Sequence, residues 1–384
     1  MELATTLTSQ TVQNAVREVG INPDYWYPVG WANELLPGNV MPVMIWQQAI
    51  ALYRDSNHQI HALEDACAHK GVALHKGKVE GCHLTCPYHG WEFNGSGECV
   101  NVPYLPKDQK LPRALVRSYP VQEKYNLIWV FPGDASLAHT CELLDIPEFQ
   151  HPDWLMVRVT AKMPAHFSIC NENSMDVFHG YLHQNLQGWF SPVLKSLRET
   201  DSSVCAEYEV SYKGHLAKFL GLSDSANEIT TRTTSVQYRY PHYYAQLEGI
   251  STLYLMRLPV GLAESRSFSI FFLKIRLPKW LRKRIEPLLQ TILSRFVFMK
   301  FLEQDIEMMH SEQQTYLKNP QRRYVEINPA IIAVERLIMR QYEQFVQKSS
   351  QLPMIRNRRP EAIVSGQVES TRCDEGKGIN GNGE

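Results

Sequence analysis

The sequence predicts an α+β protein in which a β-rich domain precedes a larger domain that combines an antiparallel sheet with flanking helices. Three observations predict this arrangement. Short apolar runs separated by turn signals fill residues 25–134, longer alternating and aromatic-rich runs lie within residues 204–261, and apolar residues recur at helical spacing after residue 280. The 384 residues are enough for two ordinary domains.

The composition excludes several functional classes. Hydrophobic residues make up 44% and charged residues 21% of the chain, which is typical of soluble globular proteins. The formal net charge of −1 gives no reason to expect a nucleic-acid partner. Residues 1–19 lack the basic and apolar regions of a secretory signal, and no run approaches the ~20 apolar residues of a membrane span. With eight cysteines and no export signal, we expect reduced thiols and a cytoplasmic location.

The first domain follows an N-terminal arm, residues 1–24. Short apolar runs such as Val43–Trp46 and Ile50–Tyr53 are separated by turn-forming pairs, which is the pattern of short strands. Leu127–Phe131, just before a Pro-Gly pair, is typical of a closing strand. Residues 135–160 are loop-like, and we place the domain boundary there.

The second domain, residues 145–350, contains both helical and strand periodicities. Its expected elements are a helix at Asn171–His183, strands at Val236–Tyr240 and Ser251–Leu258, and helices at Trp280–Leu317 and Ala330–Lys348. Residues 351–384 end in a polar, glycine-rich run that is expected to be a disordered tail.

Two Cys/His pairs in the first domain predict a metal cluster. Cys67 and His69 form one pair, and Cys86 and His89 form the second. Two thiolates on one iron and two imidazoles on the other are the ligands of a Rieske [2Fe–2S] centre. A mononuclear zinc site uses the same ligand types, but zinc motifs group Cys with Cys and His with His. Three further side chains could replace a ligand: Cys82, His75 and His83.

A histidine pair in the second domain predicts a second metal site. His179 and His183 are separated by four positions, so on a helix their side chains share one face. A carboxylate would complete a two-histidine, one-carboxylate triad with open positions for oxygen. Asp176 lies about 10 Å along the helix axis from His183, so it is a poor third ligand. The acidic run after residue 302 is the best source, and its candidates are Glu303, Asp305, Glu307 and Glu312.

These motifs together resemble the Rieske non-haem iron ring-hydroxylating oxygenases. The matching segments are Tyr25–Val29, the hexapeptide Cys86–Trp91, Tyr119–Val121, Ile128–Val130 and Asn173–His183. The sequence departs from the family's motifs at three places. Ala68-His69-Lys70 replaces the usual Pro-His-Arg, and Asn126 replaces the usual Gly. His179 and His183 are separated by three residues rather than four. The layout is most similar to the vanillate demethylase, pheophorbide a oxygenase and chlorophyllide a oxygenase type.

The resemblance implies a fold, a reaction and a set of roles. It implies a helix-grip, START-like catalytic domain that uses O2 to hydroxylate or oxidatively demethylate an aromatic or other hydrophobic ring substrate at Fe(II). It selects Asp305 as the third iron ligand. It implies that Asp176 connects His89 or His69 of one subunit to His179 of the next within a homotrimer, and that Asn173 lines the same site. The alternative function is a Rieske electron carrier or redox sensor without oxygenase activity.

The electron source and the substrate are less well defined by the sequence. Gly95-Ser96-Gly97 lacks the remainder of a dinucleotide-binding motif, so a separate reductase or ferredoxin is expected to supply electrons. The basic stretch 279–284 could dock an acidic ferredoxin or an anionic membrane surface, as a peripheral contact. Aromatic and apolar side chains are candidates for the substrate pocket or for plain core: Leu186, Trp189, Phe190, Tyr238, Tyr240, Tyr243, Tyr244, Tyr254 and Met256.

Overall fold

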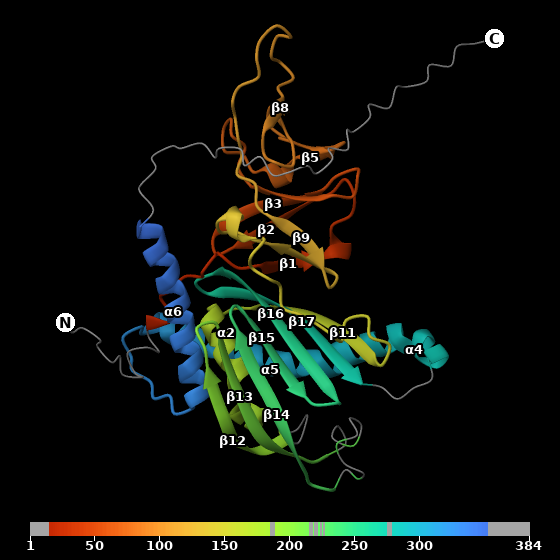
Figure 1. Ribbon diagram of the computed structural model, residues 1–384, viewed down its shortest axis with the longest axis vertical. Helices are drawn as coiled ribbons and strands as arrows, with labels where there is room; N and C mark the ends of the chain where they lie inside the picture. Colours follow the sequence, from red (N-terminus) through yellow and green to blue (C-terminus); the bar gives the residue numbers. More distant parts are fainter. Residues whose placement is uncertain are drawn as a thin grey trace. The chain divides into compact units, whose positions relative to one another are not determined.

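The computed structural model describes residues 15–184, 189–214, 218, 222, 225, 227–274 and 279–351 (Figure 1). The chain divides into two compact units. Among the described residues, one contains 15–34, 43–49 and 120–346, and the other contains 35–42, 50–119 and 347–351. The predicted tail, residues 351–384, lies outside the described residues apart from the backbone of Gln351.

The smaller unit is built from short antiparallel strands, as predicted for this part of the chain. One sheet has the order β2-β3-β4 and another has the order β5-β6-β7-β8. The strands are β2 (Val40–Ile45), β3 (Gln48–Arg54), β4 (Ile60–Glu64), β5 (Lys78–Glu80), β6 (His83–Thr85), β7 (Glu92–Phe93) and β8 (Cys99–Asn101). A buried cluster that includes Tyr53, Leu63, Leu84 and Phe93 forms the core between them.

A third small sheet has the order β1-β10-β9 and belongs to the larger unit. Its strands are β1 (Tyr27–Trp31), β9 (Val121–Lys124) and β10 (Leu127–Val130). All four side chains of β10 are buried, which confirms the strand predicted at Leu127–Phe131.

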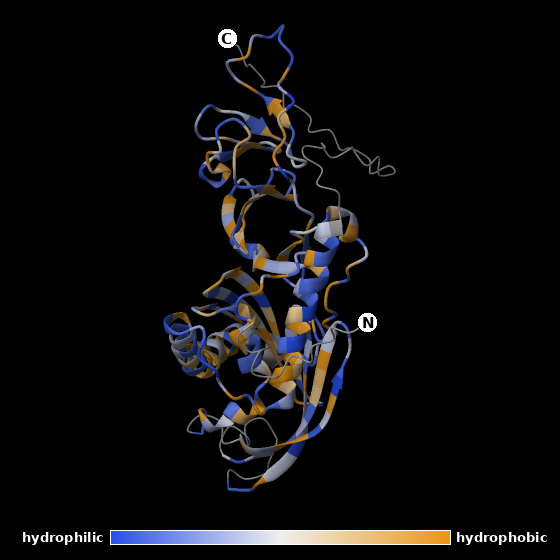
Figure 2. Ribbon diagram, turned by 90° about the vertical axis from the view of Figure 1, so that its left-hand side faces the viewer, coloured by the Kyte–Doolittle hydropathy of each residue, from blue (hydrophilic) through white to orange (hydrophobic). Residues whose placement is uncertain are grey.

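The large antiparallel sheet has seven strands in the order β11-β17-β16-β15-β14-β13-β12 (Figure 1). They are β11 (Trp154–Met163), β12 (Trp189–Glu199), β13 (Ser203–Tyr212), β14 (Thr230–Arg239), β15 (His242–Leu247), β16 (Ser251–Gly261) and β17 (Glu264–Lys274). Hydrophobic and hydrophilic residues alternate along these strands (Figure 2). The loop expected over residues 135–160 is wrong at its end, because the alternating buried residues Leu155, Val157 and Val159 already belong to β11.

Helices α2 (Phe167–Met175) and α5 (Met299–Lys318) pack against each other and lie across one face of the large sheet (Figure 1). A π-helix, Leu293–Phe298, joins α4 (Lys279–Ile292) to α5, which confirms the helical spacing after residue 280. The last helix, α6 (Pro329–Gln351), confirms the one predicted at Ala330–Lys348.

The single helix predicted over Asn171–His183 is wrong. Helix α2 ends at Met175 because Asp176 takes an extended conformation, with φ −82° and ψ 94°. The Asp176 side chain then accepts a hydrogen bond from the Phe178 amide and caps a 3-10 helix, Val177–Tyr181. The segment predicted to bind metal therefore forms two short helices with a break between them.

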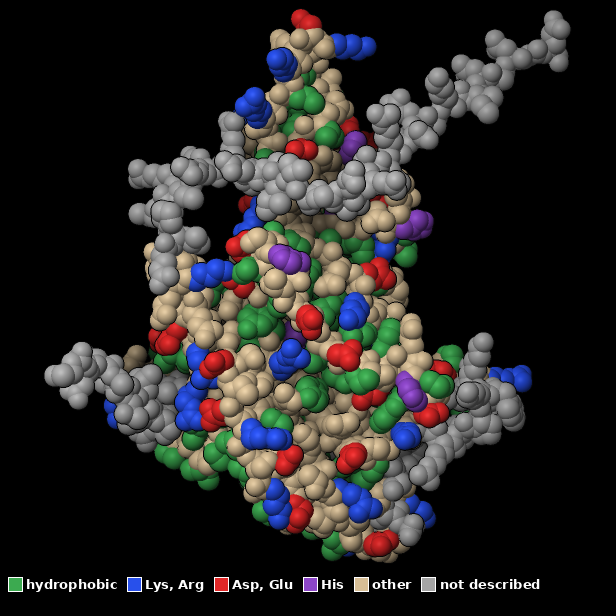
Figure 3. Space-filling view, viewed as in Figure 1, with side chains coloured by type: hydrophobic (Ala, Val, Ile, Leu, Met, Phe, Trp, Pro, Cys, Tyr) green, Lys and Arg blue, Asp and Glu red, His purple; other side chains and the backbone are tan. Residues whose placement is uncertain are grey.

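The described surface carries charges of both signs. On the face shown in Figure 3, Lys and Arg side chains are interspersed with Asp and Glu side chains over the described residues. None of the described helices combines the length and the apolar character that crossing a bilayer requires. The side chains of Lys279, Arg282 and Lys283, in the basic stretch 279–284, lie outside the described part of the chain.

Candidate metal centres

The two Cys/His pairs lie on two loops of similar design in the smaller unit. The Gly71 amide donates to the Cys67 carbonyl at 2.8 Å, and the Gly90 amide donates to the Cys86 carbonyl at 3.1 Å. Both glycines have left-handed φ values, +69° and +72°, which a glycine adopts without a steric penalty. Each loop therefore turns back immediately after its histidine.

These loops bring the four side chains together. Cys67 and Cys86 are 4% and 3% exposed, and their thiols interact with each other. The rings of His69 and His89 have centroids 4.7 Å apart and are half-buried. Two buried thiols with two imidazoles on their outer side fit the ligand set of a Rieske cluster.

The environment of these side chains also fits ligands rather than free polar groups. The Nδ1 atom of His69 is buried and has no hydrogen-bond partner among the described residues. Its ring stacks on Trp91, which holds its orientation, at a centroid distance of 4.8 Å. Burial raises the pKa of the Cys67 thiol to about 11, so a thiolate here needs a bound metal to stabilise it.

The alternative histidines are engaged elsewhere in the smaller unit. His75 Nδ1 is paired with Asp65, and His83 Nδ1 lies 3.6 Å from Glu92 Oε2. Neither imidazole is needed to complete the four-residue set.

Three side chains in the larger unit converge on one point. Asp305 Oδ1 lies 3.1 Å from His183 Nε2 and 3.7 Å from His179 Nε2, and the two imidazole centroids are 5.2 Å apart. Potential ligand atoms of all three residues lie within 4.8 Å of one another. His179 comes from the 3-10 helix, His183 follows that helix, and Asp305 comes from α5. Two imidazoles and one carboxylate are the donor set of a non-haem iron facial triad.

The other acidic candidates do not join this group. Glu303 and Glu307 are exposed on the opposite side of α5. Glu312 Oε1 accepts a hydrogen bond from Arg17 Nη2 at 2.7 Å. Only Asp305 among the four candidates faces both histidines.

Gln304 is a part of this site that the sequence analysis missed. Its Oε1 atom lies 2.8 Å from His183 Nδ1. Because an amide oxygen only accepts, His183 Nδ1 carries a hydrogen, and Nε2 is the ring nitrogen that faces Asp305 and is available to a metal. No local pattern marks Gln304, since its partner is far away in the sequence.

Burial and charge act differently on the two histidines. Burial lowers the pKa of His179, whose Nδ1 atom has no partner among the described residues. Burial also opposes the charged form of His183, but contact with Asp305 outweighs it and raises that pKa. A divalent cation at this point would favour neutral imidazoles on both residues.

Asn173 and Asp176, the other two predicted site residues, lie at the edge of this group. Asn173 Nδ2 donates to Asp305 Oδ1 at 3.4 Å. Asp176 Oδ1 accepts from Asn328 Nδ2 at 3.2 Å, a contact that the sequence analysis did not anticipate. The Asp176 side chain is therefore held in place by the backbone of Phe178 and by Asn328.

A cavity of about 310 Å³ opens beside the three converging residues. It lies between the large sheet and the helices α2 and α5, and its walls are mostly apolar. Trp189 lies at the end of the cavity where His179 and His183 line it. Its ring centroid is 5.7 Å from the ring centroid of each histidine. A Cβ atom on Gly180 would overlap this indole, so a glycine is required there.

The predicted pocket residues divide between this cavity and the core. Trp189 and Tyr243 line the cavity. The remaining described candidates are absent from its lining: Phe190, Tyr238, Tyr240, Tyr244, Tyr254 and Met256. Tyr238 and Met256 are fully buried core residues, and Leu186 lies outside the described residues.

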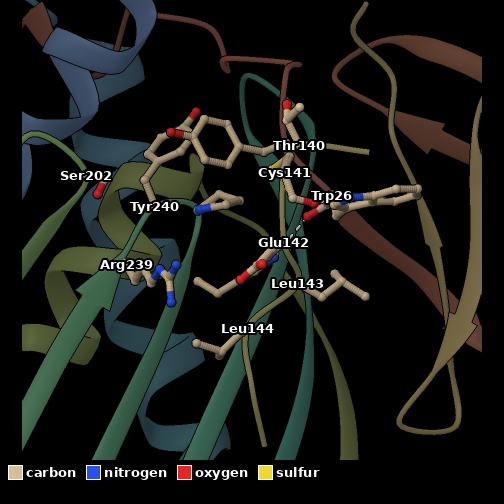
Figure 4. A pocket seen from close by; sticks show the side chains of 12 residues that line it. Trp26, Thr140, Cys141, Glu142, Leu143, Leu144, Ser202, Arg239 and Tyr240 are labelled. Atoms are coloured by element: carbon tan, nitrogen blue, oxygen red, sulfur yellow. Dashed lines mark hydrogen bonds between the residues drawn. The ribbon is translucent and has the colours of Figure 1, made fainter. Parts of the chain in front are cut away.

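A second cavity of about 230 Å³ lies in the larger unit, and Figure 4 shows its lining. Glu142 and Leu144 come from the loop before β11, and Arg239 comes from the end of β14. Trp26 Nε1 donates to the Cys141 carbonyl in its wall at 2.8 Å. It shares no described lining residue with the first cavity and contains none of the three converging residues.

Comparison with known proteins identifies the family. Residues 25–120 match the Rieske [2Fe-2S] domain. The chain is 32% identical over 343 residues to 4beta-methylsterol monooxygenase from Methylococcus capsulatus, a match that covers 86% of this chain and 91% of the relative. It is 30% identical to the iron-sulfur subunit of the toluene-4-sulfonate monooxygenase system from Comamonas testosteroni, over 52% of this chain and 60% of that one.

The fold also agrees with a solved structure. Dicamba monooxygenase bound to 3,6 dichlorosalicylic acid superimposes with a TM-score of 0.69 over 86% of this chain and 99% of that chain, at 22% identity. At this identity the likeness shows the fold alone, and it confirms the predicted α+β architecture.

The chain belongs to the Rieske oxygenases, because its similarity to a monooxygenase of this kind extends over most of both chains and includes the Rieske domain. It is an O2-dependent oxidoreductase with a Rieske [2Fe–2S] cluster, rather than an electron carrier alone, and His179, His183 and Asp305 have the donor set of a non-haem iron site. Members of this family oxidise hydrophobic substrates with electrons from a separate reductase or ferredoxin.

Proposed function

We propose that this chain is an oxygenase component that hydroxylates or oxidatively demethylates a hydrophobic ring substrate in the cavity beside His179, His183 and Asp305. The convergence of these three side chains at one end of an apolar cavity is the observation that carries the proposal.

Two groups of residues hold the cofactors in this proposal. In the first domain, residues 25–134, the cluster ligands are Cys67, His69, Cys86 and His89. In the catalytic domain, residues 145–350, His179, His183 and Asp305 hold Fe(II). Bound iron would supply the activation of O2 beside the substrate.

The surrounding residues orient the ligands and exclude water. Gln304 fixes the tautomer of His183, and Asn173 donates to Asp305, so both ligands are oriented before a metal arrives. Trp189 packs against both imidazoles. The apolar walls favour a substrate with a hydrophobic body and keep water away from the reacting carbon.

We also propose that Asp176 connects two copies of the chain within a homotrimer. Its carboxylate would orient a cluster histidine, His89 or His69, of one subunit and His179 of the next. Large apolar side chains near Asp176 are exposed in the single chain, as expected of a surface that a second copy covers. They are Phe178 (46% exposed), Tyr181 (82%), Val325 (75%) and Ile327 (85%).

Iron analysis with EPR spectroscopy tests the proposed ligands. Anaerobically purified, dithionite-reduced wild type should show the Rieske signal, and His179→Ala should contain one iron fewer per chain with the same signal. Oxidation of a substrate with O2 and a reductase should be lost in that variant. Glu307→Gln, an exposed position on α5, is the matched control and should behave as wild type. Full turnover by His179→Ala would refute the iron site.

A further inference from the structure

An exposed row of apolar side chains runs along α4 and the π-helix that follows it. Leu288 is 62% exposed, Ile292 is 41% exposed and Phe296 is 58% exposed. The three residues are four positions apart, so their side chains lie on one face of the helices. The i→i+5 hydrogen bonds of the π-helix widen its turns, which keeps Phe296 in line with Ile292. We call these three residues the apolar stripe.

The opposite face of the same helices is packed into the protein. Leu293 is buried against Leu155 and Val157 of β11. Leu293, Val297 and Phe298 also line the proposed substrate cavity. These contacts account for the position of the helices beside β11 (Figure 1). The fold therefore does not depend on the apolar character of the stripe.

Basic side chains flank the apolar stripe at both ends. Arg284 lies four positions before Leu288, and Lys300 lies four positions after Phe296. Arg295 precedes Phe296 directly. All three basic side chains are exposed, and none of them forms an ion pair with a described residue. Their charges are therefore available to a partner.

The sequence of this segment is basic as a whole. Residues 279–300 contain six Lys or Arg residues and a single acidic residue, Glu286, whereas the whole chain has a formal net charge of −1. A helix that is rich in Lys and Arg and exposes a row of Leu, Ile or Phe is typical of helices that lie in the interface of a lipid bilayer.

We propose that the apolar stripe and its basic flanks dock this protein on the surface of an anionic lipid membrane. The apolar stripe enters the boundary between headgroups and acyl chains, and Arg284, Arg295 and Lys300 contact the lipid phosphates. The partner that matches both features has an apolar interior beneath a negatively charged surface, which is the chemistry of such a membrane.

An acidic electron donor is the competing partner for a basic surface. A donor must approach the Rieske cluster, whose four proposed ligands belong to the smaller unit, whereas the apolar stripe belongs to the larger unit. The helices that carry the stripe also line the substrate cavity with their other face. A membrane explains this placement, because an apolar ring substrate partitions into the same bilayer. This last argument rests on the proposed function, whereas the docking itself does not.

Vesicle sedimentation with the full, cluster-loaded chain tests the docking without turnover. The vesicles consist of phosphatidylcholine alone or of an equimolar mixture of phosphatidylcholine and phosphatidylglycerol. Wild type should bind the anionic vesicles about tenfold or more tightly than the neutral ones at low ionic strength, and added salt should reduce the difference. Hydrogen exchange should show that residues 284–300 become protected on the anionic vesicles.

A triple-serine variant, Leu288→Ser with Ile292→Ser and Phe296→Ser, tests the apolar stripe. It should bind the anionic vesicles about tenfold or more weakly than wild type, because the apolar area that enters the interface is lost. Leu317→Ser is the matched control, since Leu317 is exposed on α5, about 30 Å along the helix axis from Phe296, and it should bind as wild type does. Circular dichroism and the cluster spectrum establish folding, and Phe296→Ser alone replaces the triple-serine variant if that variant does not fold.

A triple-glutamine variant, Arg284→Gln with Arg295→Gln and Lys300→Gln, tests the charges. It should lose most of the preference for anionic over neutral vesicles. Its cluster should still be reduced by an acidic ferredoxin at the wild-type rate, because the proposal assigns these side chains to lipid and not to the electron donor.

Four results would overturn the proposal. Wild type could stay in solution with both kinds of vesicle, or the triple-serine variant could bind the vesicles as wild type does. A changed oligomeric state of the triple-serine variant in light scattering would assign the stripe to an interface between copies of the chain. Slower reduction of the triple-glutamine variant by ferredoxin would assign the charges to the electron donor. None of these results depends on oxygenase activity, so a failure here is distinct from a failure of the iron-site proposal, which His179→Ala tests.

Discussion

Gln304 offers a sharp test of how the protein prepares its metal site. His183 is 2% exposed, and its Nδ1 atom donates to Gln304 Oε1 at 2.8 Å. Gln304→Leu keeps the approximate volume and removes the acceptor. The imidazole can then shift its hydrogen to Nε2 and donate to Asp305 Oδ1, 3.1 Å away. A metal ion would have to displace that hydrogen before it could bind.

The expected loss of metal affinity in Gln304→Leu follows from the burial of His183. Leaving a buried donor without its acceptor costs about 1–3 kcal/mol. At about 1.4 kcal/mol for each tenfold change, the metal affinity should fall by roughly 5- to 150-fold. This range agrees with the roughly 10- to 100-fold loss of metal affinity that is typical when a hydrogen-bond partner of a metal ligand is removed.

The assay is an anaerobic Fe(II) titration of cluster-loaded protein against a competing chelator. Glu303→Gln is the matched control, since Glu303 precedes Gln304 on α5 and its side chain is exposed. The control should bind iron as wild type does, and the Rieske spectrum should be unchanged in both variants. Wild-type affinity in Gln304→Leu would show that His183 does not ligate through Nε2 in the manner described.

Three further outcomes are expected. Asp176→Asn should leave both metal contents unchanged and slow single-turnover electron delivery by roughly tenfold or more, and unchanged kinetics would remove the bridging role. Gly180→Ala should lower the free energy of unfolding by about 1–3 kcal/mol in a urea titration, because its Cβ atom overlaps Trp189; wild-type stability would contradict this overlap. Burial and neighbouring carboxylates raise the pKa of Glu335 above its ordinary value near 4.5. The folded state therefore holds the proton more tightly, and stability should fall as the pH rises from about 4.5 through the raised pKa of about 9. Glu335→Gln should reduce the fall in Tm with rising pH. An unchanged slope of Tm against pH would show that other groups cause the pH dependence.

Some of this protein could be predicted from the sequence because the relevant interactions are local. Cys67 and His69 belong to one tight turn, and so do Cys86 and His89, so the residue types and their spacing already define two ligand-bearing loops. Strands β14 and β16 of the large sheet and the late helices follow from the period of their apolar residues, which reports which face of each element is buried.

The prediction at Asn171–His183 failed where a local interaction competes with helical spacing. The Asp176 side chain bonds to the Phe178 amide and starts a new helix, and the sequence spacing alone does not reveal that choice. The histidines converge because a 3-10 helix and the turn after it place them together, not because they share one face of an α-helix.

Only the tertiary structure decided which distant side chains meet. Asp305 was one of four acidic candidates, and the packing of α5 against α2 turns it, rather than its neighbours, towards the histidines. Gln304 carries no local signal, because its role depends on His183, which lies far away in the sequence and meets it only when the elements pack. Sequence periodicity determines which face of an element is buried, whereas the groups that face each other across a cavity depend on how whole elements pack.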